Sequence, residues 1–323
     1  MGDNNTLEFK LMSREERISF YLGKNLQEQE WKDENTFTFQ SFLKKNYNIR
    51  CVDQVYIKPI KSIFESMNFT EKTFKFQHGD IQDEVDPFCL VKNRCPDSEK
   101  GVILNSFNHH RHWGHFYKKP SDLPYENKRN IAFWRGTTTG SKYKDEGFTL
   151  DEFKKHIRKA NRFDLVTQYG KNNQYCNIGF SFLHRRYLFK DYNQYRKGSV
   201  PLTEFLKHKF IISVEGNDKD SGLNWKLNSN SLVIMPKPTF TTWLMETTLV
   251  ENYHYLRVED DWSDLIEKII YAIDHPEIVK NMIKNANQFM SQFSNLVEEK
   301  ELEKEVLTRY FEIVDEKRMK TLG

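Results

Sequence analysis

The sequence contains few cysteines, and none stands in a metal-binding pattern. Its four cysteines form no Cys-x-x-Cys pair and have no histidine partners at zinc-finger spacing. We therefore expect no structural metal site and no disulfide framework. Thiols used in this way fit a reducing compartment, and we expect a cytoplasmic protein.

The sequence also lacks a segment that could cross a membrane. No apolar run approaches the length of a membrane span. Residues 1–6 are polar and lack the apolar core of a signal peptide. The same residues match the loose myristoylation pattern Met-Gly-x-x-x-Ser/Thr, which is short enough to arise by chance. We expect at most a peripheral contact with a membrane surface.

No excess of one charge sign marks the chain as a nucleic-acid binder. Lysine and arginine total 49 against 46 aspartates and glutamates, so the net charge is only +3. Binding to nucleic acid needs a concentrated basic surface. A nucleic-acid-binding module built on the His- and Arg-rich residues 109–117 would therefore require a steep salt dependence of binding.

Apolar and aromatic residues, by contrast, are plentiful. They make up 38% and 14% of the 323 residues, enough for two hydrophobic cores. Residues 118–129 are rich in Lys, Pro, Asp and Asn without an apolar period, which predicts a loop and a domain boundary. We predict one domain over residues 1–125, a second over 126–275, and C-terminal helices over 276–323 that pack back across both.

Strand and helix patterns alternate in the second half of the chain. We predict strands at 130–134, 210–214, 231–235 and 253–258, and helices at 150–160, 221–228, 243–249 and 265–273. Outside this region we predict a helix at 52–67, short extended runs at 73–77, 88–91 and 102–106, and a terminal helix with one apolar face around 302–314. The alternation is typical of a parallel, doubly wound α/β sheet, which binds ligands at the carboxyl ends of its strands.

The first candidate ligand loop follows the predicted strand at 130–134. It reads Arg135-Gly136-Thr137-Thr138-Thr139-Gly140. Glycines let the backbone approach a ligand, hydroxyl and amide groups donate hydrogen bonds, and arginine supplies positive charge. This combination suits a diphosphate, although the same residues could form a simple turn.

The second candidate loop follows the predicted strand at 210–214 and leads directly into a helix. It contains Glu215, Gly216, Asn217, Asp218, Lys219, Asp220 and Ser221. Its carboxylates could accept the hydroxyl groups of a sugar, and a helix N-terminus favours an anion such as phosphate. We expect either Asp218 or Asp220 to cap the helix and the others to face a ligand.

Two further segments could supply a general base. The histidine-rich segment 109–115 has no carboxylate or cysteine to complete a metal site. It could be a surface loop, or a wall of the acceptor site that holds a base. Asp80, which follows Gly79 at a strand end, could take a proton from a hydroxyl group or could be a turn residue.

Taken in this order, the segments resemble glycosyltransferase family 90 over residues 74 to 290. The family contains lipopolysaccharide-modifying and capsule-related transferases of microbes and viruses, and the protein O-glucosyl- and O-xylosyltransferases of animals. Phe133-Trp134-Arg135-Gly136 matches its Phe-Arg-Gly motif, and 79–80, 91–94 and 111–113 are similar to the microbial and viral branch. Further matching segments are 208–218, 221–223, 229–231, 243–246, 254–255 and 264–265.

The resemblance implies a GT-B fold of two Rossmann-like domains, a UDP-sugar donor and an inverting reaction that needs no metal or other cofactor. It implies an enzyme that moves xylose or a hexose to a hydroxyl group of an oligosaccharide or other glycan acceptor. The donor-binding residues that we predict are Arg135, Gly136, Thr137, Thr138, Glu215, Gly216, Asn217, Asp218, Ser221, Lys226, Ser231 and Glu246.

The sequence departs from the animal enzymes at two places. There, an Asp after an Asn-x-Arg element is the base, whereas Asn108, which cannot take a proton, stands here. We therefore predict Asp80 as the base, with His109 and His112 as alternatives. The arginine in the helix after the donor loop is also missing, and Lys226 is the nearest cation. Asn108 keeps open a second hypothesis, a catalytically inactive relative that binds nucleotide-sugar or glycan.

Overall fold

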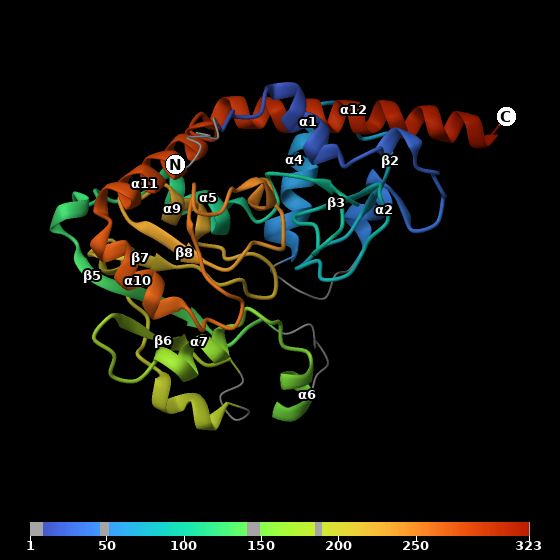
Figure 1. The fold of residues 1–323 in the computed structure, drawn as a ribbon. Helices are drawn as coiled ribbons and strands as arrows, with labels where there is room; N and C mark the ends of the chain where they lie inside the picture. Colours follow the sequence, from blue (N-terminus) through green and yellow to red (C-terminus); the bar gives the residue numbers. More distant parts are fainter. Residues whose placement is uncertain (1–8, 46–51, 141–148, 185–188, 323) are drawn as a thin grey trace.

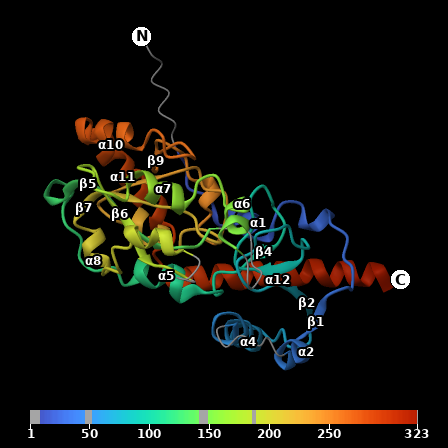
Figure 2. The same cartoon turned by 90° about the horizontal axis from the view of Figure 1, so that it is seen from below.

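Two separate sheets organise the chain. A computed structural model describes residues 9–45, 52–140, 149–184 and 189–322 (Figure 1). Every strand pair in it is parallel except that of β1 with β2. The turned view in Figure 2 places β5, β6 and β7 at one end of the molecule and β1 and β2 at the other. The protein is thus a mixed α/β structure with parallel sheets.

The first sheet is built from short apolar strands in the order β1-β2-β3-β4. Its strands are β1 (Thr36–Thr38), β2 (Thr73–Phe76), β3 (Cys89–Val91) and β4 (Val102–Ile103). The helical segments of this half are α1 (Arg14–Leu22), η1 (Leu26–Glu28), α2 (Phe39–Lys44), a π-helical turn (Asp53–Ile57), α4 (Lys58–Ser66) and α5 (His109–Tyr117). The predicted helix at 52–67 and the three predicted extended runs are confirmed.

The second sheet has the order β6-β5-β7-β8-β9. Its strands are β5 (Arg129–Thr137), β6 (Cys176–Phe182), β7 (His208–Ile212), β8 (Leu232–Met235) and β9 (Leu256–Arg257). Its α-helices are α6 (Leu150–Lys155), α7 (Arg162–Tyr169), α8 (Leu202–Phe205), α9 (Leu223–Leu227) and α10 (Leu265–Asp274). Short 3-10 turns occupy Tyr125–Asn127, Lys190–Tyr195 and Glu246–Thr248.

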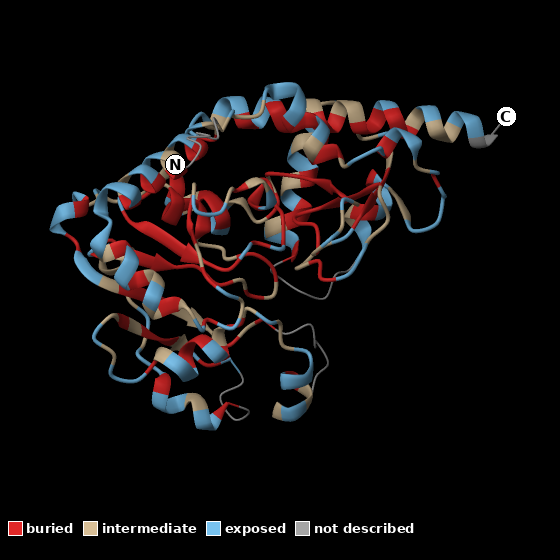
Figure 3. Ribbon diagram, viewed as in Figure 1, coloured by how far each residue is buried: buried red, intermediate tan, exposed pale blue. Residues whose placement is uncertain are grey.

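The last two helices, α11 (Pro276–Ser291) and α12 (Leu296–Leu322), run along one side of the molecule (Figure 1). Figure 3 shows α12 with its buried face toward the body and its exposed face outward. The buried residues include Leu302, Val306, Tyr310, Phe311 and Val314, which confirms the apolar face predicted from their spacing. They share one apolar cluster with the first sheet and with Val233 and Met235 of the second.

One predicted helix, at 243–249, is wrong. The segment forms only the 3-10 turn Glu246–Thr248, because Met245 adopts a left-handed conformation with φ of 61°. The Glu246 carboxylate accepts hydrogen bonds from the backbone N–H of Thr242 at 2.6 Å and from its hydroxyl group at 2.8 Å. Trp243, Leu244 and Met245 are all buried, so their apolar run reflects an enclosed loop.

Other boundaries shift. The helix predicted at 150–160 begins with the expected capping box of Thr149 and Glu152 but ends at Lys155. The strand predicted at 130–134 continues to Thr137, so the first part of the candidate loop belongs to β5. The segment 109–115 is helical rather than a loop. Helix α7 and strand β6 had no sequence prediction.

Three expectations concern features that the sequence lacks: a membrane-spanning helix, a metal site and a disulfide framework. Among the described helices, none is both long and apolar enough to cross a membrane. The described residues contain no cluster of three or more His, Cys, Asp or Glu that could hold a metal ion. Cys89, Cys95 and Cys176 are buried free thiols, while Cys51 and the myristoylation pattern at 1–6 lie outside the described residues.

Candidate active site

A cavity of about 620 Å³ lies at the carboxyl ends of the strands, between the two sheets. Asp80, Gln82 and Arg111 line it from the side of the first sheet. Residues 134–139 of β5 and the loop after it, and residues 216–221 after β7, line it from the second. Parallel α/β sheets bind ligands in this position. We call this cavity the cleft.

A second cavity of about 510 Å³ adjoins the cleft and shares Lys219 and Asp220 with it. Residues 155–160, 235–239 and Glu246 contribute to its walls. Its apolar lining includes Ile157, Leu223, Met235, Pro236 and Pro238. We call this cavity the side pocket. It combines flat apolar surface with a few charged groups, as sites for small ligands usually do.

The Arg135–Thr138 segment is shaped by packing within the second sheet. A Cβ at Gly136 would lie 2.4 Å from the Trp134 ring, so the buried indole requires glycine here. The Arg135 guanidinium donates to the backbone oxygens of Trp134 at 2.7 Å and Asn177 at 2.9 Å, which fixes it along the β5–β6 pair. Thr138 is buried, and its hydroxyl donates to the backbone oxygen of His184 at 3.3 Å.

Two arginines that the sequence reasoning missed hold the ends of β5 and β7 together. Arg162 of α7 donates to the backbone oxygen of Thr137 at 3.1 Å, to the Thr139 hydroxyl at 2.7 Å and to the backbone oxygen of Val214 at 3.1 Å. Arg158 donates to the backbone oxygens of Gly216 and, at 2.6 Å, Asn217. The sequence signal that could have identified them is their spacing of four residues, shortly after the Thr149 capping box.

These arginines form no close ion pair with a carboxylate of the described residues. Within the described residues, no carboxylate oxygen lies within 4.0 Å of a guanidinium nitrogen of Arg135, Arg158 or Arg162. Burial lowers the pKa of Arg158, and it lowers those of Arg135 and Arg162 to about 10. Because desolvated cations without counter-ions are costly, the site favours an anionic ligand.

The loop after β7 divides its carboxylates between structure and cleft. Glu215 accepts hydrogen bonds from the backbone N–H groups of Thr239 at 2.8 Å and Phe240 at 3.0 Å, so it holds the loop after β8. Burial raises the pKa of Glu215. Asp220 accepts from the backbone N–H of Gly222 at 2.9 Å, just before α9. Asp218, Gly216, Asn217 and Ser221 line the cleft.

Asp80 and Asp218 meet at one lysine. The Lys92 ammonium lies 2.5 Å from Oδ1 of Asp80 and 2.7 Å from Oδ2 of Asp218. Burial opposes ionisation of Asp80, but Lys92, Arg111 and a hydrogen bond from Asn217 lower its pKa. For Asp218, burial outweighs the attraction of Lys92 and raises the pKa, with a contribution from the charge of Asp80. Asp80 therefore carries the more firmly ionised carboxylate.

The two alternative bases, His109 and His112, lie on α5. Nδ1 of His109 is 3.3 Å from both the backbone and the side-chain oxygen of Asn105, and the ring stacks near Trp113 and Tyr117. His112 is buried, and burial lowers its pKa well below the ordinary value. Neither histidine lines the cleft, whereas Asp80 does.

The remaining predicted donor residues are spread more widely. Glu246 forms a fully buried ion pair with Lys219 at 3.0 Å and lines the side pocket. Lys226 donates to the backbone oxygen of Ile212 at 3.1 Å and pairs with Asp220. Ser231 donates to the backbone oxygen of His208 at 2.7 Å, at the end of β8 that points away from the cleft. Of these three residues, Glu246 and Lys226 lie near the carboxyl ends of the second sheet, and Ser231 does not.

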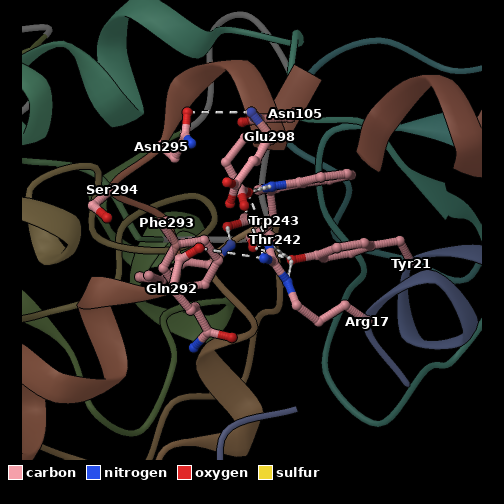
Figure 4. Close-up of polar contacts among 12 residues, drawn as sticks. Arg17, Tyr21, Asn105, Thr242, Trp243, Gln292, Phe293, Ser294, Asn295 and Glu298 are labelled. Carbon is pink, nitrogen blue, oxygen red and sulfur yellow. Dashed lines mark hydrogen bonds and ion pairs between the residues drawn. The ribbon is translucent and has the colours of Figure 1, made fainter. Parts of the chain in front are cut away.

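A buried polar network lies behind the loop that carries Glu246 (Figure 4). Arg17 of α1 donates to both carboxylate oxygens of Glu299 on α12, at 2.8 and 2.7 Å. The Trp243 indole donates to Glu299 at 2.5 Å, and the Tyr21 hydroxyl donates to the backbone oxygen of Trp243 at 2.9 Å. Figure 4 shows Arg17 and Tyr21 reaching from α1 toward Trp243. The network fastens α1 and α12 to the loop after β8.

The amino-acid sequence is similar to those of known proteins. Residues 109–318 match the model of the family described as glycosyl transferase family 90. The chain is 30% identical over 247 residues to "O-glucosyltransferase LpsA" of Dichelobacter nodosus, a match that covers 76% of this chain and 69% of that protein. It is also 31% identical over 101 residues to "Uncharacterized protein 179R" of Invertebrate iridescent virus 6, which covers 29% of this chain and 8% of that protein.

Proposed function

The chain belongs to glycosyltransferase family 90, and from this membership we propose that it transfers a sugar from a UDP-sugar to a hydroxyl group of a glycan. The bacterial relative is named an O-glucosyltransferase. That name favours a hexose, glucose first, over xylose as the transferred sugar. The two sheets facing one cleft support a GT-B arrangement, with domains over 1–125 and 126–275 and the helices of 276–323 packing across them.

The observation that carries the proposal is the positive charge without a carboxylate partner where the cleft, lined by Arg162, meets the side pocket, lined by Arg158. Arg158 and Arg162 lie at the ends of β5 and β7 without carboxylate partners among the described residues. A nucleotide diphosphate would supply the missing negative charge. It would sit beside the backbone of residues 137–139 and the loop of residues 216–221. In this proposal the arginines, rather than a metal ion, stabilise the departing diphosphate.

The two cavities divide the donor between them. We assign the nucleoside to the side pocket, where Ile157, Met235 and Pro236 offer apolar surface. We assign the transferred sugar to the cleft, which Asp80 and Asp218 line. Lys219 and Asp220, which belong to both cavities, mark the boundary at which the diphosphate would lie.

The reaction that we propose is a single displacement with inversion. Asp80 takes the proton of the acceptor hydroxyl as its oxygen forms a bond to the anomeric carbon. The bond from that carbon to the diphosphate oxygen breaks at the same time, and UDP departs with the bonding electrons. The carboxylate of Asp80 is ionised at neutral pH because Lys92 lowers its pKa against the effect of burial. It is therefore ready to accept the proton.

An inactive relative that binds nucleotide-sugar without turnover is the second candidate. The observation that favours it is Asn108, which has a left-handed backbone with φ of 55° at the start of α5 and offers no basic group. In such a protein the arginines would still bind the donor. UDP binding without UDP release would support this candidate.

The deciding experiment measures UDP release across a panel of UDP-sugars, with EDTA present. We expect turnover with one donor that EDTA does not reduce. Asp80→Asn should lower that turnover about 1,000-fold, the usual size of a general-base contribution. Asp86→Asn is the matched control, because Asp86 also pairs with a buried lysine, Lys75 at 2.6 Å, but lies outside the cleft.

Each other outcome changes one part of the proposal. Turnover that survives Asp80→Asn would remove Asp80 from the reaction and move the base to His109 or His112. UDP binding without release by the wild type would establish the inactive relative. If the wild type neither binds UDP nor releases it from any donor, the assignment of a UDP-sugar as donor is wrong.

A further inference from the structure

Lys92 forms ion pairs with carboxylates from both sides of the cleft. Its side chain is only 3% exposed, and its ammonium contacts Asp80 and Asp218 at 2.5 and 2.7 Å. Lys92 directly follows β3, and Asp80 follows β2, both in the first sheet. Asp218 belongs to the loop after β7 in the second sheet. A single ammonium therefore holds the candidate base against the candidate donor loop.

The cluster contains one positive and two negative charges. Burying a cation is costly unless carboxylates compensate it, and both carboxylates of this cluster touch the same ammonium. Asp80 keeps 31% of its side chain exposed, whereas Asp218 keeps 11%. The ammonium thus holds one oxygen of Asp80 in the wall, while 31% of the Asp80 side chain stays exposed and the residue lines the cleft.

A second connection crosses the same boundary. The Gln82 side-chain amide donates to the backbone oxygen of Asn217 at 3.0 Å. Asn217 hydrogen-bonds to the Asp80 carboxylate through its side chain, and its Oδ1 accepts from the backbone N–H of Gly140 at 3.2 Å. The base is consequently tied to both loops of the second sheet that line the cleft. Gly79, with φ of 95°, makes the turn that delivers Asp80 to this place.

We propose that Lys92 is the positioning residue of the transfer reaction: its ammonium aims Asp80 at the acceptor hydroxyl and, through Asp218, sets the distance between the base and the donor-binding loop. The inference rests on the proposed glycosyl transfer with Asp80 as base. Lys92 itself takes no part in bond making or breaking, because both carboxylates already occupy its ammonium group.

This role has a signature in the dependence of the rate on pH. Among the described residues, the charged and titratable groups that act on Asp80 include the cations Lys92, Arg111 and Arg158, together with Asp218 and Tyr56. Loss of the closest cation raises the pKa of Asp80. Because the base acts only when ionised, the acidic limb of kcat/KM must then move to higher pH.

The experiment compares kcat/KM from pH 4 to pH 9 in Lys92→Met, Lys92→Arg and Lys75→Met, with UDP release as the assay. Lys75 is the matched control, since it is 2% exposed and pairs with Asp86 on the same sheet but away from the cleft. We expect the acidic limb of Lys92→Met to move up by about one pH unit or more. Lys92→Arg should keep the limb near its wild-type position, and Lys75→Met should lose stability without moving it.

A rate for Lys92→Met that falls equally at every pH, as in a merely structural role, would overturn the proposal. If Lys92→Met does not fold, Lys92→Gln decides the question, because it removes the same charge but keeps a hydrogen-bond donor, and its acidic limb should also lie at higher pH than that of the wild type. An unmoved limb in Lys92→Gln would also overturn the proposal. Wild-type protein that releases no UDP with any donor would instead sink the proposed function, and this inference with it.

Discussion

The molecule contains two groups of arginines that differ in one respect. In the network behind the loop after β8, Arg17 meets both oxygens of Glu299, and the Trp243 indole donates to the same carboxylate. Arg162 at the cleft and Arg158 at the side pocket donate to backbone oxygens and to one hydroxyl group, with no carboxylate within 4.0 Å among the described residues. One group contacts a carboxylate directly, and the other has no such contact within the described residues.

For these residues, the difference accompanies a structural role in the network and the proposed binding role at the two cavities. Burial acts against the charge of Arg17, but Tyr21 and Glu299 overcome it and raise the pKa of Arg17. Burial prevails at the cleft and lowers the pKa of Arg162 to about 10. An internal ion pair is complete without a ligand, whereas an unpaired cation gains most when an anion arrives. The contrast can be tested from both sides.

The largest effect is expected at the paired site. Arg17→Met leaves the carboxylate of Glu299 buried without a counter-ion and should lower the free energy of unfolding by about 3–5 kcal/mol. Urea denaturation measures it. Arg14→Met is the control, because Arg14 pairs with Glu305 while 50% exposed and should change stability by less than about 1 kcal/mol. Equal losses in the two variants would contradict the structural role of the network.

The next effect is expected at the unpaired site. Arg162→Met should lower kcat/KM for the UDP-sugar about 100-fold, the usual consequence of removing one donor that faces developing charge. It should also reduce the rise in melting temperature that saturating UDP produces. Arg129→Met, 60% exposed at the opposite end of β5, should change neither quantity. A kcat/KM within threefold of wild type would remove Arg162 from the donor site.

A smaller effect sharpens the contrast within α12. Glu303, one turn after Glu299, has no cation within 4.0 Å among the described residues, and burial raises its pKa from 4.5 to about 7. The folded state therefore holds this proton more tightly than the unfolded state. Stability should fall as pH rises from about 4.5 to about 7, by about 3 kcal/mol at most.

Urea denaturation at pH 5 and pH 8 tests this expectation in the wild type and in Glu303→Gln. The variant keeps an oxygen that can accept the hydrogen bond from the backbone N–H of Ser106, which Glu303 receives at 2.7 Å. It should flatten the difference between the two pH values. An unchanged difference would show that another group controls the pH dependence.

Local patterns predicted much of the fold. The apolar spacing was sufficient to predict the buried face of α12, and the Thr149 capping box was sufficient to predict the start of α6. Both patterns depend on residues within a few positions of each other. Strand β6 had no prediction because Gly179 interrupts its pattern. A Cβ there would lie 2.8 Å from the backbone oxygen of Tyr195. Glycine therefore allows β6 to approach the backbone at Tyr195, a contact that only the fold reveals.

The predicted site residues show the same division. Asp80 and Asp218 were candidates from their places at strand ends, and both line the cleft. Glu215 was expected to face a ligand; it lines the side pocket, and its carboxylate also accepts hydrogen bonds from the backbone N–H groups of Thr239 and Phe240. Arg158 and Arg162 had no prediction, because they lie in a segment whose strand and helix boundaries were only partly recognised.

The sequence by itself determined the family, the parallel α/β character and the strand ends at which charged residues gather, since each depends on residue type and short spacing. Only the tertiary structure decided which charges are neutralised. Arg17 meets Glu299 across 282 positions of the chain, and Lys92 joins carboxylates that come from different sheets. Coulomb interactions depend on distances of a few ångströms in space, and sequence separation does not encode those distances.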